Sequence, residues 1–251
     1  MRLLFSICLI GALATATHAA EPASDPLRSP LWSGMRQRML GSDPVVFDAR
    51  VQLRMPATAE NPLAVPVEVR FDGLAGAERV LVFADLNPIP KILDYRPGTA
   101  GGALAFRFKV EQSTPMRAAV RTQDGVWHVG GAWLTAAGGG CTMPSQASGN
   151  PAWQERLGEV SARLWPRSDG ASRLRLRVIH PMDTGLAGGI PVFHVEGLAL
   201  HDAGGRELAS LQLYEPVAEN PVLSLDLRHR GVLRIEGRDT QGNRIHAEVA
   251  P

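Results

Sequence analysis

RLRLRV, residues 173–178, alternates three arginines with three aliphatic residues. Successive side chains of a β-strand point to opposite faces, so this stretch puts its leucines and valine on one face of a sheet and its arginines on the other. The pattern is typical of an antiparallel sheet with one buried face and one face in water. The stretch therefore predicts an all-β fold in this part of the chain.

Short runs rich in Val, Leu and Phe repeat along most of the chain. Turn signals such as Asn87–Pro88, Pro97–Gly98 and Asp124–Gly125 separate them. About seven strands at this spacing indicate an antiparallel sandwich of immunoglobulin type, and a second set predicts a second, smaller sandwich. The predicted strands are 45–55, 65–72, 79–85, 91–95, 103–110, 117–122 and 126–134, then 173–179, 190–200, 207–214, 222–227, 231–238 and 244–249.

Two helices are expected between these strands. Residues 30–40 form an apolar stripe through Trp32 and Met35, and Gly41 follows as a stop signal. Residues 151–164 predict a second helix, with Asn150 as its candidate cap and proline in its first turn.

The N-terminus has the order of a secretory signal peptide. Arg2 precedes an apolar run over residues 3–14 and small residues at 15–20, and cleavage after Ala19 or Ala20 fits best. The apolar run is shorter than the roughly 20 residues that a spanning helix needs, so we expect an exported protein that is not held in a membrane.

Charge and motif content exclude several classes of function. The formal net charge of the chain is +1, which gives no support for nucleic acid or an anionic membrane as partner. GxGxxG, P-loop and GxSxG motifs are absent from the sequence. The histidines beyond the predicted signal peptide have no zinc-site spacing, so no metal site is predicted; they are His128, His180, His194, His201, His229 and His246.

One cysteine stands out in the stretch GGGCTMPSQASGNP, residues 138–151. Gly138, Gly139 and Gly140 predict a flexible arm, and we expect a mobile loop over residues 137–150. Residues 129–154 contain no charged residue or histidine, so the Cys141 thiol is expected to be exposed with an ordinary pKa of about 8.5.

Cys141 is the only cysteine left once the signal peptide, with Cys8, is removed. A single thiol in an oxidising compartment cannot make an internal disulfide. It is therefore free, modified, or paired between molecules, in which case a disulfide through Cys141 would link a homodimer.

The motifs also carry a family resemblance. PVEV at 66–69, VFADLNPIP at 82–90 and the Gly-rich cysteine resemble the SoxY subunit of the sulfur-oxidation carrier. IHPMDTGL at 179–186, NPVLSLDL at 220–227 and IEGRDTQGN at 235–243 are similar to SoxZ. The chain as a whole resembles the fused SoxYZ-like carriers associated with quinoprotein dehydrogenases.

The resemblance implies an organisation of the whole chain. Two immunoglobulin-like antiparallel sandwiches, SoxY-like and then SoxZ-like, would be joined by the cysteine arm and a short helix. The predicted parts are a signal peptide at 1–20, an N-terminal segment at 21–42, the SoxY-like sandwich at 43–137, the arm and linker helix at 138–171, and the SoxZ-like sandwich at 172–251.

What the resemblance implies for function is a periplasmic carrier and not an enzyme, with no catalytic residue and no cofactor of its own. Cys141 would carry a sulfur-compound adduct, as in thiosulfate oxidation, and Gly138, Gly139 and Gly140 would be its hinge. Its partners would be sulfur-oxidising enzymes, or a quinoprotein dehydrogenase and its cytochrome. The sequence departs from the SoxY pattern because Thr142 follows the cysteine in place of glycine and the arm continues into another domain.

Two other functions stay open. The protein could be a non-covalent accessory module of a periplasmic quinoprotein (PQQ) dehydrogenase system, with Cys141 incidental. A thiol redox protein is the third class, although the mature chain has no resolving cysteine. A turn or packing role is expected for His180, and the residues Asp85 and Asn87 are expected to shape a strand connection.

Overall fold

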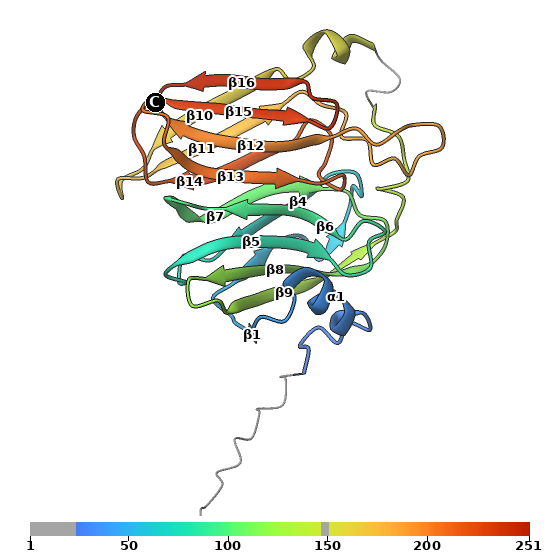
Figure 1. Cartoon of the computed structure of the whole chain (residues 1–251). Coiled ribbons are helices and arrows are strands. Elements are labelled where there is room, and N and C mark those ends of the chain that lie inside the picture. The colour runs from blue at the N-terminus through green and yellow to red at the C-terminus, as the bar shows by residue number, and fades with distance from the viewer. Residues whose placement is uncertain (1–23, 147–150) are drawn as a thin grey trace, which may run out of the picture.

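The computed structural model describes residues 24–146 and 151–251. The predicted signal peptide at 1–20 and residues 147–150 of the predicted mobile loop lie outside the described residues. The described part is mostly β-structure in two facing sheets (Figure 1), so the prediction of an all-β sandwich fold is confirmed. None of its helices is long and apolar enough to cross a lipid bilayer.

Most elements follow the predicted order, with bounds that differ by a few residues, but the strands at 58–59 and 160–166 were not predicted. The first half contains α1 (Trp32–Leu40), β1 (Val45–Phe47), β2 (Gln52–Arg54), β3 (Thr58–Ala59), β4 (Val65–Arg70), β5 (Ala77–Ala84), β6 (Lys91–Arg96), β7 (Ala100–Phe108), β8 (Thr114–Thr122) and β9 (Trp127–Ala136). The second half contains the 3-10 helix η2 (Pro151–Arg156), β10 (Val160–Pro166), β11 (Ser172–Val178), β12 (Val195–Asp202), β13 (Glu207–Leu213), β14 (Val222–Leu227), β15 (Leu233–Asp239) and β16 (Arg244–Val249).

Both sheets run through the two halves of the chain. The ten-stranded sheet has the order β1-β9-β8-β5-β6-β13-β12-β15-β16, with β3 on β9, and the six-stranded sheet has the order β10-β11-β14-β7-β4-β2. The halves meet where β6 pairs with β13 and where β7 pairs with β14, both antiparallel. The two predicted sandwiches are therefore joined edge to edge and share one pair of sheets.

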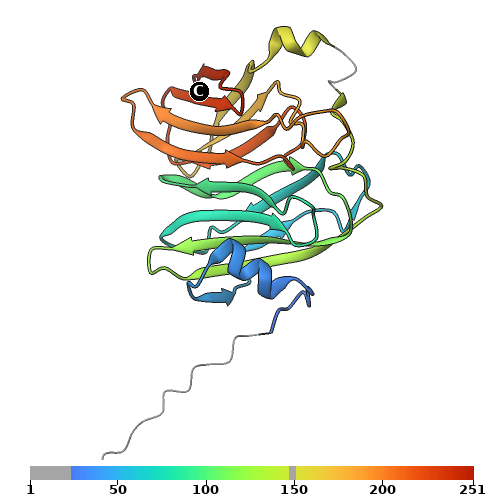
Figure 2. The same ribbon diagram turned by 45° about the vertical axis from the view of Figure 1, so that its right-hand side comes forward.

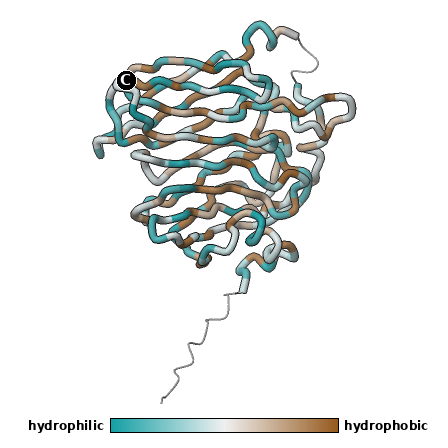
Figure 3. Tube along the Cα trace, in the orientation of Figure 1, coloured by the Kyte–Doolittle hydropathy of each residue, from teal (hydrophilic) through white to brown (hydrophobic). Residues whose placement is uncertain are grey.

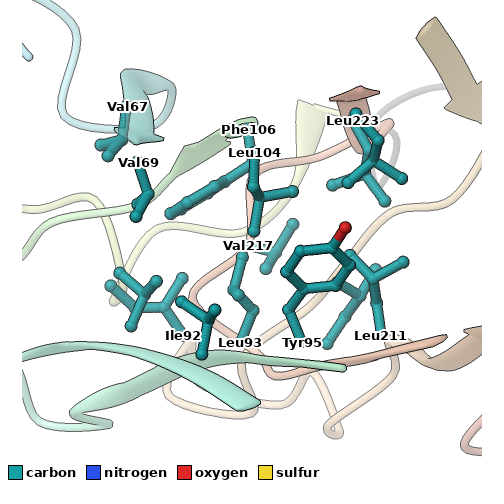
Figure 4. Packing of buried hydrophobic residues seen from close by; sticks show 14 of the residues in the cluster. Val67, Val69, Ile92, Leu93, Tyr95, Leu104, Phe106, Leu211, Val217 and Leu223 are labelled. Carbon is teal, nitrogen blue, oxygen red and sulfur yellow. The ribbon is translucent and has the colours of Figure 1, made fainter. Parts of the chain in front are cut away.

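A single hydrophobic core fills the space between the sheets. Hydrophobic and hydrophilic residues alternate along the strands (Figure 3), as expected for strands with one buried face. Leu93 and Tyr95 of β6 face Leu104 of β7 and Leu223 of β14 across the sandwich (Figure 4), and all four are fully buried. Because these strands flank the junction, core packing continues from one half to the other.

The helix α1 lies across the outer face of the ten-stranded sheet in the first half (Figure 2). Met35 and Leu40 pack there on Phe83 and Trp127. Beside the helix, the guanidinium of Arg117 is 1% exposed and pairs with two carboxylates, Asp25 at 2.7 Å and Asp85 at 3.0 Å. The N-terminal segment is thus fixed to the sheet by apolar packing and by a buried ion triad.

The predicted strand 45–55 is two strands in two sheets. β1 pairs with β9 in parallel, whereas β2 pairs with β4 in the other sheet. Asp48 makes the turn between them, because its carboxylate accepts the Arg50 N–H at 2.9 Å and its carbonyl accepts the Val51 N–H at 3.1 Å. Apolar and polar residues alternate without a break from Phe47 to Met55, and this continuous alternation concealed the crossing.

The predicted helix 151–164 is wrong in its second half. Only Pro151–Arg156 is helical, and β10 begins at Val160. Gly158 has a φ of 77° and breaks the helical path. Beyond it, Val160 and Leu164 lie opposite Val178 and Leu174 of β11. Pairing with an existing strand outweighs a helical stripe that the sequence also contains.

Candidate functional site

The cysteine lies in a segment that we call the cysteine strap, residues 138–146, which follows the end of β9. Gly138 and Gly139 take φ values of 107° and 88°, in the region that favours glycine. Gly140 has a different reason to be glycine, because a Cβ there would lie 2.2 Å from the carbonyl oxygen of Pro62 and 2.5 Å from that of Val110. The strap is therefore packed closely on the loops beneath it.

This packing corrects the expected conformation of the arm. Gly138, Gly139 and Gly140 were expected to form a flexible tether, yet the strap is anchored at Gly140. The Gly140 N–H donates to the Val110 carbonyl at 3.0 Å. The physical reason is that glycine, which has no Cβ, permits close approach of another backbone as well as conformational freedom. At Gly140 it is the close approach of the Val110 loop that matters.

Glu111 clamps the strap next to the cysteine. Its Oε2 accepts the backbone N–H groups of Cys141 at 3.0 Å and Thr142 at 3.1 Å. The Thr142 hydroxyl donates to Oε1 of the same carboxylate at 3.1 Å. Hydrogen bonds to an ionised carboxylate are stronger than neutral ones, so Glu111 makes the largest polar contribution to this conformation.

The second half of the chain also holds the strap. The Thr184 hydroxyl donates to the Cys141 carbonyl at 2.6 Å. The Ser145 N–H donates to Asp183 at 3.1 Å, and the Gln146 N–H donates to Glu219 at 2.7 Å. The strap therefore bridges the two halves, with side-chain oxygens of three loops as its partners.

The thiol of Cys141 is buried, with an exposed fraction of 0%. Its Sγ donates to the Lys109 carbonyl at 3.5 Å, and the Asn87 Nδ2 lies 3.7 Å from it. Burial, aided by the carboxylate of Glu111, raises the pKa of this thiol to about 12, and the ammonium of Lys109 opposes the rise only in part. The expectation of an exposed thiol with a pKa of about 8.5 is thus corrected.

Two residues beside the sulfur, Lys109 and Asn87, were not predicted as site residues. Lys109 is 2% exposed, and its ammonium donates to the Met182 carbonyl. Burial lowers the pKa of Lys109, against the effect of Asp183 and Glu219. Asn87 donates to the Lys109 carbonyl at 3.1 Å and accepts the Glu111 N–H at 3.0 Å, so it orders the loop that faces the sulfur.

A signal for Asn87 was present in the sequence, because the residue lies in the VFADLNPIP motif; its role was read as strand connection only. Lys109 ends an ordinary alternating strand, and nothing in that pattern distinguishes it from a solvent-facing lysine. Its burial depends on Met182 and Asp183, which are distant in sequence.

His180 lies inside the second half, with its ring 4.4 Å from that of Phe193. Its Nδ1 accepts the Met182 N–H at 3.1 Å, and its Nε2 lies 3.4 Å from Asp239. Burial lowers the pKa of His180 to about 4, although Asp239 opposes the shift. Across residues 24–146 and 151–251, no group of three or more potential metal-ligating side chains is arranged to hold an ion.

The described residues form a β-sandwich in which the thiol of Cys141 is buried. Residues 36–141 match the family model described as sulfur oxidation protein SoxY, so the resemblance of the first half is confirmed at the level of the family model. The resemblance of the second half to SoxZ stays a prediction. No curated protein matches the chain.

One solved structure with similarity to the chain is the sulfur carrier protein SoxY from Chlorobium limicola f thiosulfatophilum. The two are 19% identical, with a TM-score of 0.38, and the alignment covers 42% of this chain and 96% of that one.

Proposed function

We propose that this protein is a covalent carrier of the periplasm, which holds a sulfur-containing or related electrophilic group on Cys141 and passes it between partner enzymes. The observation that carries the proposal is where the family match ends. Residues 36–141 match SoxY, and the last matched residue is the single cysteine of the predicted mature chain. A carrier needs one unambiguous attachment point, and Cys141 supplies it.

The contacts of the sulfur support a carrier over an enzyme. A catalytic cysteine needs a positioned base to form its thiolate. The described hydrogen-bond partners of the Cys141 Sγ are a backbone carbonyl and an amide group, which cannot take its proton. The chemistry of loading and unloading therefore falls to sulfur-oxidising partner enzymes, and the protein itself is their substrate.

Burial gives the carrier a resting state. With a pKa of about 12, the thiolate fraction of Cys141 at pH 7 is about 1 in 100,000. Only thiolate reacts readily with oxidants and disulfides, so the closed strap protects the thiol in an oxidising compartment. Loading requires that the strap leave Glu111 and expose the sulfur to a partner.

The buried thiol also favours a second candidate function, a non-covalent accessory module of a periplasmic quinoprotein (PQQ) dehydrogenase system. A sulfur that is 0% exposed in the described structure could serve packing alone. In that case the partner would be the dehydrogenase or its cytochrome, and Cys141 would bear no cargo.

Replacement of the cysteine separates the two functions. Cys141→Ser keeps the size of the side chain and its hydrogen bond to the Lys109 carbonyl, so the fold should persist. If the protein is a covalent carrier, a strain with Cys141→Ser in place of the native gene should lose the oxidation reactions that depend on the carrier. Full activity of that strain, with normal levels of the folded variant, would establish the accessory role.

A further inference from the structure

Four exposed arginines gather on the outer face of the six-stranded sheet. They are Arg107 of β7, Arg163 of β10, and Arg175 and Arg177 of β11, and we call this set the arginine face. The strand register places Arg163 directly opposite Arg175, and Arg177 opposite Val222 of β14. The four side chains therefore share one face of three strands.

The carboxylates around the arginine face already have other partners. Asp226 pairs with Arg173 at 2.7 Å, and Glu68 lies 3.4 Å from Arg70. Glu159, at the start of β10, pairs with Arg156 at 2.6 Å. Within the described chain, none of the four arginines of the arginine face forms an ion pair.

Such an arrangement costs stability. Like charges directly opposite each other on a sheet repel, and Arg163 and Arg175 occupy that position. Overall basic composition cannot account for the cluster, because the chain carries a net charge of only +1. The positive charge of the arginine face is thus a local feature, which Glu159 near Arg177 and Glu68 in the larger depression offset only in part and which a bound anion would neutralise.

The surface between the arginines is hollowed. Two adjoining depressions of about 360 Å³ and 250 Å³ lie along it, and both are lined by Arg175 and Val222. Small residues, Ala105 and Ser224, contribute to the floor of the larger one. A polypeptide backbone can lie against this floor while its side chains reach the arginines on both sides.

We propose that the arginine face docks an extended, acidic polypeptide segment of a partner protein. Each guanidinium presents a planar fork of donors that matches a carboxylate of Asp or Glu in a bidentate manner. One feature disfavours single-stranded nucleic acid as the occupant. The guanidinium of Arg163 lies 5.2 Å from the centre of the Trp165 ring, so this ring is not free to stack on a base.

The test compares two triple variants with the same change in charge. R163Q/R175Q/R177Q removes three charges from the arginine face, and the control R96Q/R206Q/R244Q removes three exposed arginines from the strands and turns of the other sheet. Binding of a fluorescein-labelled peptide of ten glutamates is measured by anisotropy at low ionic strength. We expect the first variant to weaken binding by about tenfold to a hundredfold and the control by less than about twofold.

Three outcomes would overturn the proposal. One is an equal loss of peptide binding in both triple variants, which would mean that the peptide responds to the net charge of the protein and not to the arginine face. A second is tighter binding of a single-stranded DNA of equal charge, or of phosphatidylglycerol vesicles, than of the peptide. The third is a lower melting temperature for Arg175→Gln, because release of repulsion from Arg163 should leave the melting temperature unchanged or raise it.

Discussion

Glu111 offers the sharpest test of how the thiol is kept closed. Its carboxylate accepts three hydrogen bonds from the strap, two from the backbone N–H groups of Cys141 and Thr142 and one from the Thr142 hydroxyl. Glu111→Ala removes both acceptor oxygens, and with them all three hydrogen bonds, and leaves the rest of the strap unchanged. We therefore expect the strap to open more often and the thiol to react faster.

The size of the effect follows from these contacts. A hydrogen bond to a charged group contributes about 1.5–3 kcal/mol, and Thr142 is exposed, so water replaces part of what is lost. A total of about 2–4 kcal/mol is expected for the three bonds together. That free energy corresponds to an increase of about 30-fold to 1,000-fold in the population of the open strap.

The assay is the rate of Cys141 labelling by an aromatic disulfide reagent under native conditions. The rate of reaction of a buried group reports the population of the open form when closing is fast. Glu207→Ala is the matched control, since Glu207 is an exposed carboxylate at the start of β13. Labelling of the native chain as fast as that of the unfolded chain, or equal rates for the two variants, would refute the closed-strap account.

Three further predictions concern stability and the closure of the strap. Arg117→Met leaves the fully buried carboxylate of Asp85 without its guanidinium, so the free energy of unfolding in urea should fall by about 3–5 kcal/mol. Gly140→Ala should speed labelling of the thiol by more than Gly139→Ala. A Cβ at 140 would overlap two carbonyl oxygens, whereas one at 139 meets nothing within 4 Å and costs only the backbone strain of a φ of 88°. Burial of His180 disfavours its protonation in the folded state. The stability that this gives is fully present above pH 6.5, and the free energy of unfolding should fall by about 3 kcal/mol as the pH drops toward about 4. His180→Asn keeps an acceptor for the Met182 N–H and should flatten this pH dependence in urea titrations.

Each of these has an outcome that contradicts it. An Arg117→Met protein as stable as the native one would mean that Asp85 is not buried. Faster labelling in Gly139→Ala than in Gly140→Ala would mean that Gly140 is not the glycine whose close packing keeps the strap closed. A His180→Asn protein that loses stability in acid as steeply as the native chain would assign the pH dependence to other groups.

The sequence predicts the strands well because their signal is local. The alternation in RLRLRV fixes β11, and the turn dipeptides separate its neighbours, as the structure confirms. The same local rule fails at residues 160–166, where the register with β11 decides between strand and helix. Pairing of β6 with β13 was equally hidden, since no single run of residues records which strand edges meet.

The site shows the same division between local and distant information. Cys141 and its glycines could be singled out from the sequence, whereas the burial of the thiol could not. That burial depends on Glu111, Lys109 and Thr184, which come from other loops in both halves. Triple glycine is compatible with a free tether and with tight packing, and only the contacts distinguish them.

The central claim, a covalent carrier with its cargo on Cys141, is tested most directly by mass spectrometry. The mature protein is purified from its native compartment without reductant, its intact mass is measured with and without reduction, and peptides are mapped to residue 141. The carrier account predicts a reducible mass increment on Cys141, of the kind that sulfane sulfur or a thiosulfonate would give. A bare thiol under every growth condition would contradict it.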